Sequence, residues 1–366
     1  MAEELRALFN EQFIKKLSKE LQDNDPLFNQ EEFLSSVYAK GWDELALKQR
    51  VRRITLSLSQ SLPQEFGEAV ALLKKVAPSF QGSLGGIIFP DYVEIYGLHS
   101  WEISMEALEY FTMFSTSEFA VRPFVMENQP KMMAQFLEWS SHENEHVRRL
   151  ASEGSRPRLP WGIALINLKK DPSPIFPILE NLKEDPSLYV RKSVANNLND
   201  ISKDHPELVL HLAKRWLGTN DRTNWIVKTG LRTLFKKGVP EALELFGLDK
   251  SEHIQVKNLT VTKKVEIGEA ITFAFHITSI DKEPRKLRLE YAIDFVKANG
   301  KHSTKSFKIS ETSISPGEEK VYTKTHSFRD LSTRKHYSGK HVLHIIVNGE
   351  DKAKEEFEVM KRTQEE

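Results

Sequence analysis

Two carboxylates, Glu118 and Glu153, occur in a stretch of the sequence that is otherwise rich in arginine, and Trp161 follows the second of them. Arginine binds phosphate oxygens, whereas a carboxylate and an aromatic face both attract a positively charged group. The combination therefore predicts a site that holds a cationic group beside a polyanion. The arginines of this stretch are Arg122, Arg148, Arg149, Arg156 and Arg158.

Helical spacing gives a first expectation for Glu153. If Val147, Leu150 and Ala151 face the core, Arg149 and Glu153 fall on the opposite, exposed face of the same helix. A glycine and a proline then end this helix, so the residues after it belong to a connector. The alternative interpretation is an exposed ion pair between Arg149 and Glu153, which contributes only a few tenths of a kcal/mol.

Glu118 and Trp161 each allow two interpretations. If Glu118 is helical, it leans toward an apolar stripe and needs a partner, for which Arg122 at the next turn is a candidate. The alternative is a carboxylate at the helix start, which the helix dipole favours. Trp161 is either a core residue between helices or a partly exposed functional residue, and the proline and glycine beside it favour exposure.

Up to about residue 248 the sequence has the pattern of a helical domain, with apolar residues at spacings of three and four. A valine followed by a basic residue recurs in it. Val147, Val190 and Val227 are 43 and 37 residues apart, close to the period of about 40 to 47 in HEAT repeats. We therefore expect residues 1–248 to form a HEAT-like solenoid with a concave face. The pairs are Val51-Arg52, Val121-Arg122, Val147-Arg148, Val190-Arg191 and Val227-Lys228.

Basic residues also align along the later repeats. Lys228 and Arg232 are four positions apart in one predicted helix, and Arg191 and Lys192 lie one repeat earlier. Each of them alone is usually a solvated surface residue. Aligned across repeats, they predict a groove that contacts phosphates.

From about residue 251 the period changes to that of β-strands. Short runs rich in β-branched and aromatic residues alternate with turn signals such as Asn299-Gly300 and Asn348-Gly349. They predict that residues 251–366 form an antiparallel, immunoglobulin-like sandwich of about 100 residues. The term describes architecture only, because the chain lacks cysteine. The expected strands cover Ile254–Val261 and residues 271–277, 287–296, 321–326 and 342–347.

Composition excludes several functional classes. The 52 basic residues cancel the 52 acidic ones, so net charge gives no argument for a nucleic-acid partner. The lack of cysteine excludes disulfides, thiolate metal sites and a cysteine nucleophile, and fits a reducing cytoplasm. No apolar run reaches the roughly 20 residues of a membrane span, and residues 1–20 do not resemble a signal peptide. We expect a cytoplasmic protein without a membrane partner.

Two motifs suggest a metal or a nucleotide. Residues 142–146 read H-E-N-E-H, which matches the zinc-hydrolase pattern H-E-x-x-H. That pattern normally lies in an apolar helix, whereas charged residues and serines surround it here, so we expect no metal site. The glycine-rich loop at 82–86 lacks the Gly-Lys-Ser/Thr ending of a phosphate-binding loop. No cofactor is expected.

The blocks S-T-S-E-F-A-V-R-P-F at 115–124 and E-H-V-R-R-L-A-S-E-G-S-R-P-R-L-P-W at 145–161 resemble the signature of the AlkC family of bacterial DNA alkylation repair glycosylases. The resemblance covers the helical half, and a subset of that family carries a C-terminal immunoglobulin-like domain. It implies a HEAT-like solenoid that is related to the AlkD glycosylases and excises N-alkylated bases without a metal. It also implies that Glu118, Glu153 and Trp161 form the lesion site, with the surrounding arginines on the DNA backbone.

The resemblance further implies a monomeric, nucleoid-associated enzyme of base excision repair. Its substrates would be cationic bases such as 3-methyladenine and 3-methylcytosine in duplex DNA. Such a base leaves without strong protonation, so the enzyme must supply negative charge beside the nascent sugar cation and a positioned water. The family grips and bends the duplex without a deep base pocket.

The C-terminal domain has 22 basic and 19 acidic residues from Asp249 onward, which fits a clamp on DNA. Its candidate contacts are the loops at residues 285–288 and at Arg334-Lys335. The alternative function for the whole chain is a non-catalytic HEAT-repeat scaffold that binds protein or DNA. A scaffold of this kind predicts an exposed apolar groove.

Overall fold

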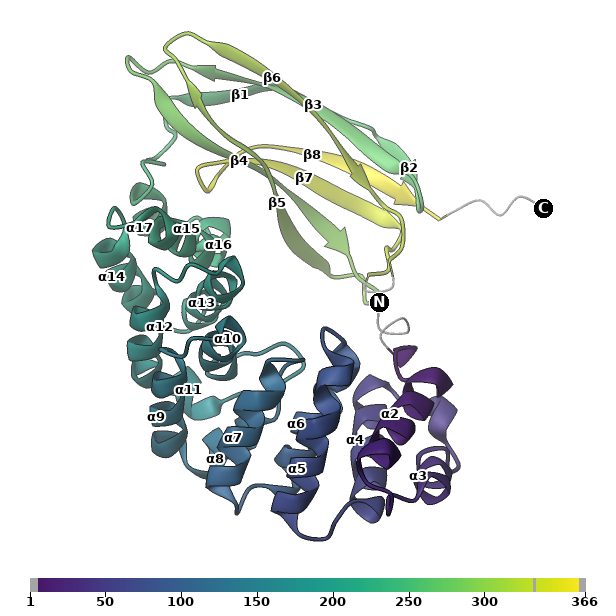
Figure 1. Cartoon of the computed structure of the whole chain (residues 1–366). Helices are drawn as coiled ribbons and strands as arrows, with labels where there is room; N and C mark the ends of the chain where they lie inside the picture. The colour runs from purple at the N-terminus through teal and green to yellow at the C-terminus, as the bar shows by residue number, and fades with distance from the viewer. Residues whose placement is uncertain (1–5, 332–333, 362–366) are drawn as a thin grey trace, which may run out of the picture. The chain divides into compact units, whose positions relative to one another are not determined.

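The chain folds into two compact units, the first mainly helical and the second mainly β-stranded (Figure 1). The computed structural model describes residues 6–331 and 334–361 of the 366 in the chain. The first unit ends at Gly230 and the second begins at Leu231. The predicted fold class, a helical solenoid followed by a β-sandwich, is confirmed.

In the helical unit, α10, α13 and α15 lie side by side in one row, and α9, α12 and α14 form a second row beside it (Figure 1). The helices are α2 (Glu11–Asn24), α3 (Gln30–Val37), α4 (Leu47–Ser61), α5 (Phe66–Val76), α6 (Ile88–Tyr96), α7 (Trp101–Thr112), α8 (Val121–Glu127), α9 (Gln129–Trp139), α10 (Glu145–Gly154), α11 (Ile166–Lys170), α12 (Phe176–Leu182), α13 (Leu188–Ile201), α14 (Pro206–Trp216) and α15 (Asp221–Gly230). Short 3-10 helices are η1 (Trp42–Glu44), η2 (Ala77–Phe80), η3 (Leu84–Ile87) and η4 (Ser173–Ile175).

Local sequence explains how a repeat helix such as α13 forms. The side chain of Ser187 accepts a hydrogen bond from the N–H of Tyr189 and so caps the start of the helix. Val190, Val194 and Leu198, spaced by four residues, are buried as one stripe. No helix within residues 6–331 and 334–361 combines the length and the apolar character that crossing a bilayer requires.

The recurring valine–arginine pair has a structural explanation. Nη1 of Arg148 donates hydrogen bonds to the carbonyls of the residues six and five positions before it, and Arg191 does the same one repeat later. Each arginine thereby satisfies carbonyls of the loop that leads into its own helix. Arg148 also pairs with Asp185 of the next repeat at 2.6 Å. The sequence predicts that both arginines contact DNA, and this stays a prediction; the donors described here bind the protein's own backbone, and Arg148 also joins two repeats.

The second unit contains a three-stranded sheet of order β1-β3-β6 and a five-stranded sheet of order β2-β8-β7-β4-β5. All neighbouring strands are antiparallel except β2 and β8, which are parallel. Their facing sides bury a continuous apolar core that includes Phe273, Ile293 and Phe328. The strands are β1 (Ile254–Val261), β2 (Lys264–Glu266), β3 (Ala270–Ser279), β4 (Arg285–Val296), β5 (His302–Ile314), β6 (Glu319–Ser327), β7 (Gly339–Val347) and β8 (Glu350–Met360).

Sequence reasoning missed β2, β5 and β8. β5 lies at the edge of its sheet, and charged or hydroxyl side chains occupy most of its positions, so it has no apolar alternation to detect. β8 is inside the sheet, but of its residues only Phe357 and Val359 are fully apolar and buried. Pairing with β7 on one side and β2 on the other, rather than its own pattern, makes it a strand.

The unit boundary also differs from the one predicted after residue 248. Two short helices, α16 (Arg232–Lys236) and α17 (Pro240–Glu244), belong to the second unit. The guanidinium of Arg288 lies 5.1 Å from the centre of the Phe235 ring. The α16–α17 connection and the β7–β8 turn also approach closely, because glycines, Gly238 and Gly349, occupy the contact. Helical periodicity identifies these helices but cannot say which core they join.

Replacing Gly349 in the β7–β8 turn tests this packing. A Cβ at Gly349 would lie 2.6 Å from the Cα of Gly238, whereas a Cβ at Gly300 would have no heavy atom within 4 Å. Both positions have positive φ, 81° and 73°, so alanine causes similar backbone strain at each. We expect Gly349→Ala to destabilise the second unit by about 1–3 kcal/mol more than Gly300→Ala does. Equal losses in urea unfolding would contradict the close approach.

Candidate functional site

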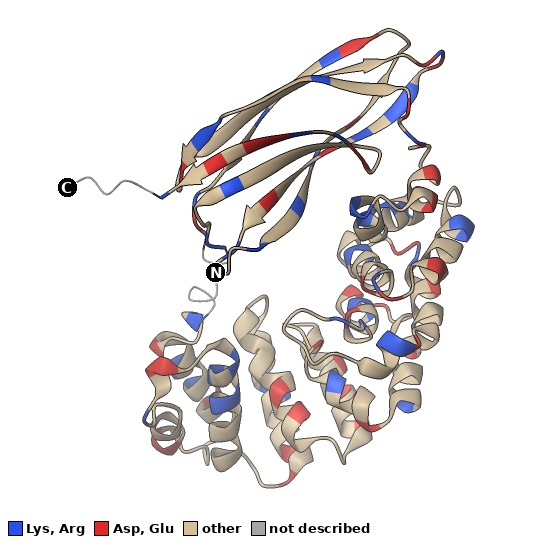
Figure 2. Cartoon of the chain, turned by 180° about the vertical axis from the view of Figure 1, so that it is seen from behind, with Lys and Arg blue, Asp and Glu red and all other residues tan. Residues whose placement is uncertain are grey.

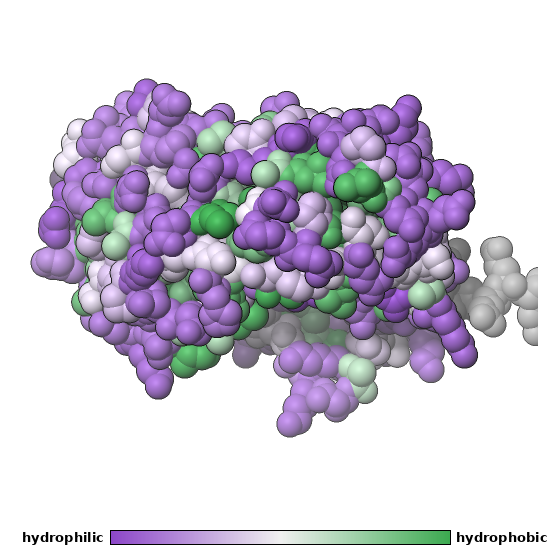
Figure 3. Space-filling view, turned by 60° about the horizontal axis from the view of Figure 1, so that its bottom comes forward, coloured by the Kyte–Doolittle hydropathy of each residue, from purple (hydrophilic) through white to green (hydrophobic). Residues whose placement is uncertain are grey.

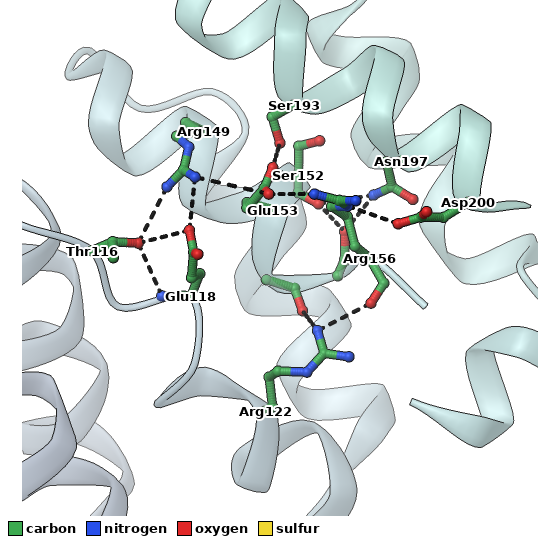
Figure 4. Close-up of polar contacts among 12 residues, drawn as sticks. Thr116, Glu118, Arg122, Arg149, Ser152, Glu153, Arg156, Ser193, Asn197 and Asp200 are labelled. Carbon is green, nitrogen blue, oxygen red and sulfur yellow. Dashed lines mark hydrogen bonds and ion pairs between the residues drawn. The ribbon is translucent and has the colours of Figure 1, made fainter. Parts of the chain in front are cut away.

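Arg149, on α10, stands at the centre of the predicted site (Figure 4). Its Nη2 lies 2.7 Å from Oε2 of Glu118 and 3.8 Å from Oε1 of Glu153. Its guanidinium carbon lies 4.8 Å from the centre of the Tyr189 ring. Burial acts to lower the pKa of Arg149, but the charges of Glu118 and Glu153 outweigh burial and raise it overall. One permanent cation therefore holds two carboxylates that are distant in sequence.

Glu118 lies in a turn before α8 and is not part of that helix. Oγ1 of Thr116 accepts a hydrogen bond from the N–H of Glu118 at 3.3 Å and donates one to its Oε2 at 2.9 Å, which fixes the turn. The predicted partner, Arg122, is wrong, because a residue outside the helix does not have the i+4 geometry. In the described part of the chain, no residue hydrogen-bonds the other oxygen, Oε1.

Glu153 is buried, with only 5% of its surface exposed, so the predicted exposed position is wrong. The physical reason is the neighbouring repeat, since α13 packs over the face of α10 that helical spacing leaves free. Oε1 of Glu153 accepts a hydrogen bond from Arg156 at 2.5 Å, and Oε2 accepts one from the hydroxyl of Ser193 at 2.5 Å. Both carboxylate oxygens of Glu153 are thus occupied.

Arg156 continues the chain of charges into the protein. It is 6% exposed, and its Nε lies 2.8 Å from Asp200, which in turn pairs with Lys203 at 2.9 Å. Burial acts to lower the pKa of Arg156, but Glu153 and Asp200 raise it overall. The sequence predicts that Arg156 contacts the DNA backbone. Its burial and its two carboxylate partners give it a role inside the protein instead.

A polar stripe on α13 completes this buried network, and sequence reasoning missed it. Ser193, Asn197 and Asp200 are buried, and Asn197 donates a hydrogen bond to the carbonyl of Ser152 at 2.8 Å (Figure 4). Their spacing of four and three residues places them on one helical face beside the apolar stripe. This spacing of polar residues within an amphipathic helix is the signal in the sequence that could have identified the stripe.

Arg122 is fully buried and binds backbone, not DNA. Its Nη1 donates to the carbonyls of Gly154 at 3.2 Å and Arg156 at 3.0 Å, and its Nε donates to the carbonyl of Ile163. Burial lowers the pKa of Arg122 to about 10. The predicted phosphate contact is therefore not available to this side chain. Arg122 instead joins the end of α10 to the connector between α10 and α11, residues 155–165.

Trp161 is exposed on that connector, with 58% of its surface accessible, so the interpretation as a core residue is wrong. Its φ of 64° lies in the left-handed region. A residue with a side chain in that region costs about 1–3 kcal/mol, which persists only where surrounding contacts fix the backbone. Ile163 and Ile166 are exposed after it, each at 52%.

The other basic residues of the helical sequence that are predicted to contact DNA are more accessible. Arg158 pairs with Asp204 at 2.6 Å, and 36% of its side chain is exposed. Lys192 and Lys228 are exposed on α13 and α15, whereas Arg232 is partly buried in the second unit. Basic and acidic residues are interspersed over both units (Figure 2). Contact of these side chains with DNA stays a prediction.

The two candidate loops of the second unit differ in accessibility. Residues 285–288, predicted as a loop, lie at the start of strand β4. Arg288 is 6% exposed and pairs with Glu290 at 2.8 Å and Glu311 at 3.0 Å, which leaves it little surface for DNA. Its neighbour Arg285 pairs with Asp281 at 2.6 Å. At the other loop, Lys335 is exposed and Arg334 partly so.

A cavity of about 430 Å³ borders the two charged groups at the centre of the site. It gives Glu118 and Arg149 access to a small ligand, which the buried Glu153 does not have. Its lining includes Ser83, Thr116, Glu118, His146, Arg149 and Tyr189.

The H-E-x-x-H pattern does not lie on one helix. Asn144 accepts a hydrogen bond from the N–H of His146 and caps α10, which begins at Glu145. His142 precedes the helix, and its Nδ1 accepts a hydrogen bond from the N–H of Asn144 at 2.9 Å. The two imidazoles therefore do not share a helical face. Residues 6–331 and 334–361 contain no cluster of three or more His, Asp or Glu side chains arranged to hold a metal ion.

Comparison with known proteins places the chain in a family. The sequence model described as DNA alkylation repair enzyme matches residues 2–234. The chain belongs to the DNA alkylation repair enzyme family. Residues 255–361 match a second model, described as the C-terminal Ig-like domain of the uncharacterised protein YhaZ.

Two similar proteins cover nearly the whole chain. YhaZ of Bacillus subtilis (strain 168), described as uncharacterized, is 54% identical over 357 residues, which are 97% of this chain and 99% of that protein. The solved structure of the Pseudomonas fluorescens alkylpurine DNA glycosylase AlkC, bound to DNA containing an abasic site analog, is 41% identical. It has a TM-score of 0.94 over 97% of this chain and 99% of AlkC. The resemblance to the AlkC family that the two sequence blocks predict is thereby confirmed.

Replacing Arg122 distinguishes a structural role from a contact with DNA. Arg122→Met removes the donors to three backbone carbonyls, two of them in buried hydrogen bonds, so we expect a loss of about 2–5 kcal/mol in the free energy of unfolding. Arg158→Met breaks a largely exposed ion pair and is expected to cost less than about 1 kcal/mol. Chemical denaturation of the full-length variants measures both. Losses of similar size would show that the three carbonyls do not depend on Arg122.

Proposed function

We propose that the protein is a DNA glycosylase that hydrolyses the N-glycosidic bond of cationic N-alkylated bases in duplex DNA, as a step of base excision repair. The observation that carries the proposal is the pair of carboxylates held by Arg149, one of which, Glu118, borders a cavity. Family membership and the similarity to AlkC along 97% of the chain support it.

The reaction requires of the protein mainly a negative charge beside the sugar. An alkylated base such as 3-methyladenine already carries a positive charge and leaves readily, while the sugar develops oxocarbenium character. A carboxylate beside the sugar stabilises that cation and accepts a proton from the attacking water. None of these steps uses a metal, and none leaves a covalent intermediate, so we propose a metal-independent, monofunctional enzyme.

The two glutamates have different environments, which suggests different roles. Glu118 borders the cavity, and its Oε1 is open to a ligand, so we assign it the water and the sugar cation. Glu153 is buried and does not border the cavity, and each of its oxygens already accepts a hydrogen bond, from Arg156 and from Ser193. We assign it to holding Arg149, and through Arg149 the carboxylate of Glu118.

Trp161 is suited to contact DNA beside the lesion. Its exposed ring offers a π-face to a cationic nucleotide, an interaction of about 0.5–2 kcal/mol depending on desolvation. Of the residues of the helical unit predicted to contact DNA, Arg158, Lys192 and Lys228 are accessible for phosphates. We propose that they contact the DNA backbone.

A non-catalytic scaffold remains the alternative to an enzyme. It predicts a continuous apolar surface for a protein partner, whereas on the face shown in Figure 3 hydrophobic residues form separate patches among hydrophilic ones. A gel shift with duplex DNA whose affinity falls as salt rises favours the nucleic-acid partner. Release of a base by the wild-type protein excludes a purely structural role.

Glutamine substitutions test the two glutamates. We expect Glu118→Gln and Glu153→Gln each to reduce single-turnover release of 3-methyladenine from alkylated DNA by at least about 100-fold, because negative charge at the sugar is lost or misplaced. Binding to abasic-site DNA should change by less than about threefold, since neither group contacts phosphate.

Thermal stability distinguishes the roles of Glu118 and Glu153. Glu153→Gln should lower Tm, because it weakens a buried ion pair, while Glu118→Gln should not. A matched control is Glu138→Gln on α9, an exposed position. Excision at the wild-type rate by the double variant Glu118→Gln/Glu153→Gln would refute the mechanism.

The accessible basic loop of the second unit tests the clamp. Replacing Arg334 and Lys335 together by glutamine should weaken binding to duplex DNA about 3- to 10-fold at 0.1 M salt and reduce the salt slope by about 1–2. The control replaces Lys257 and Lys324, exposed on β1 and β6, and removes the same charge elsewhere on the unit. Equal weakening by both pairs would mean that only net charge matters.

A further inference from the structure

Lys48, near the start of α4, reaches the connector that carries Trp161. Its Nζ donates a hydrogen bond to the backbone carbonyl of Trp161, although 113 residues separate them. The same ammonium lies 4.5 Å from the centre of the Phe119 ring, and Phe119 directly follows Glu118. One cation from an early helix therefore contacts both chain segments that supply the proposed site.

The connector lacks packed support on the side from which Lys48 approaches. A cavity of about 210 Å³ lies there, between α4, α6 and the connector. A chain segment that faces a cavity has fewer packing contacts with other side chains than one that faces a filled core. A polar contact across the cavity then matters more for the position of the connector. Residues lining it include Lys48, Arg52, Asp91, Glu94, Phe119 and Gly162.

The backbone of the connector is held at two points on either side of Gly162. Arg122 binds the carbonyl of Ile163, and Lys48 binds the carbonyl of Trp161. Trp161 has a φ of 64°, which a residue with a side chain keeps only under constraint. Without Lys48, the carbonyl of Trp161 loses this donor, and the peptide group after Trp161 keeps only the hydrogen bond from the N–H of Gly162 to the carbonyl of Leu159 at 3.1 Å.

Two acidic residues, Asp91 and Glu94, line the cavity that Lys48 enters. Arg52 pairs with Asp91 at 3.1 Å and with Glu94 at 2.7 Å on the wall that faces Lys48. Burial lowers the pKa of Lys48, and the negative charges of Glu94 and Asp91 act against that shift. The direct contacts of the ammonium that fix its position are the aromatic face of Phe119 and the carbonyl of Trp161.

We propose that Lys48 is a positioning residue, which holds the left-handed backbone of Trp161 so that its indole meets the DNA beside Glu118. The inference rests on the proposed function, since Trp161 acts there on bound DNA. Lys48 itself touches neither the reacting sugar nor the base. Its effect passes through the connector.

The activity test uses full-length Lys48→Met, which keeps the length and packing of the side chain but loses the donor. We expect the single-turnover rate of base release to fall by about tenfold, with Tm within about 2 °C of wild type. Lys48→Arg, which keeps a donor and a charge, should recover most of the rate. The control, Lys75→Met at an exposed position on α5, should keep the wild-type rate. A wild-type rate for Lys48→Met would overturn the inference.

A double-mutant cycle shows whether the effect passes through Trp161. If Lys48 acts by positioning the indole, Lys48→Met should cause no further loss once Trp161 is alanine. Losses that multiply would mean that Lys48 acts independently, and this outcome would overturn the inference.

A measurement that needs no catalysis separates this inference from the proposed function. The chain has six tryptophans, so 5-fluorotryptophan labelling gives six fluorine resonances, and Trp161→Phe identifies the one from Trp161. In Lys48→Met we expect that resonance alone to shift and sharpen. If it moves in a protein that releases no base, the positioning role holds and the proposed function fails. An unmoved resonance overturns the positioning role whatever the activity.

Discussion

The candidate site depends on a chain of alternating charges that runs into the interior of the helical unit. Glu118, Arg149, Glu153, Arg156 and Asp200 follow one another as ion pairs, and Lys203 ends the series at the surface. A buried charge without a partner costs several kcal/mol, so each member fixes the position of the next. The alternation gives each carboxylate of the series a cationic partner. It also leaves one of them, Glu118, at the edge of a cavity.

This arrangement divides the arginine-rich stretch into two groups with different physical roles. Arg122, Arg148 and Arg191 use their planar set of donors to bind backbone carbonyls, and so join helices to loops. Arg149 and Arg156 instead neutralise carboxylates within the site. A protein that binds a polyanion needs basic side chains at its surface, but the most conspicuous arginines here are used inside. The accessible positive charge comes largely from lysines, such as Lys192 and Lys228.

Positioning of the site also depends on parts of the chain that contain none of its acids. The connector with Trp161 is tied to α8 by Arg122 and to α4 by Lys48. Both contacts are made to carbonyl oxygens, so they constrain the backbone without depending on the side chains of the connector. An exposed tryptophan in a left-handed conformation is thereby held in place from behind, while its ring stays accessible.

The sequence by itself determined the two architectures and the family, and it named Glu118 and Glu153 as candidate site residues, because periodicity and the two signature blocks are local properties of the chain. It also indicated that Trp161 is exposed, from the proline and glycine beside it. Tertiary structure decided which face of α10 is buried, since a single helix cannot reveal that α13 covers Glu153. It likewise decided that α16 and α17 join the β-stranded unit and that β8 is a strand. In each case the deciding contact comes from another element of the chain, and the spacing along one element carries no record of it.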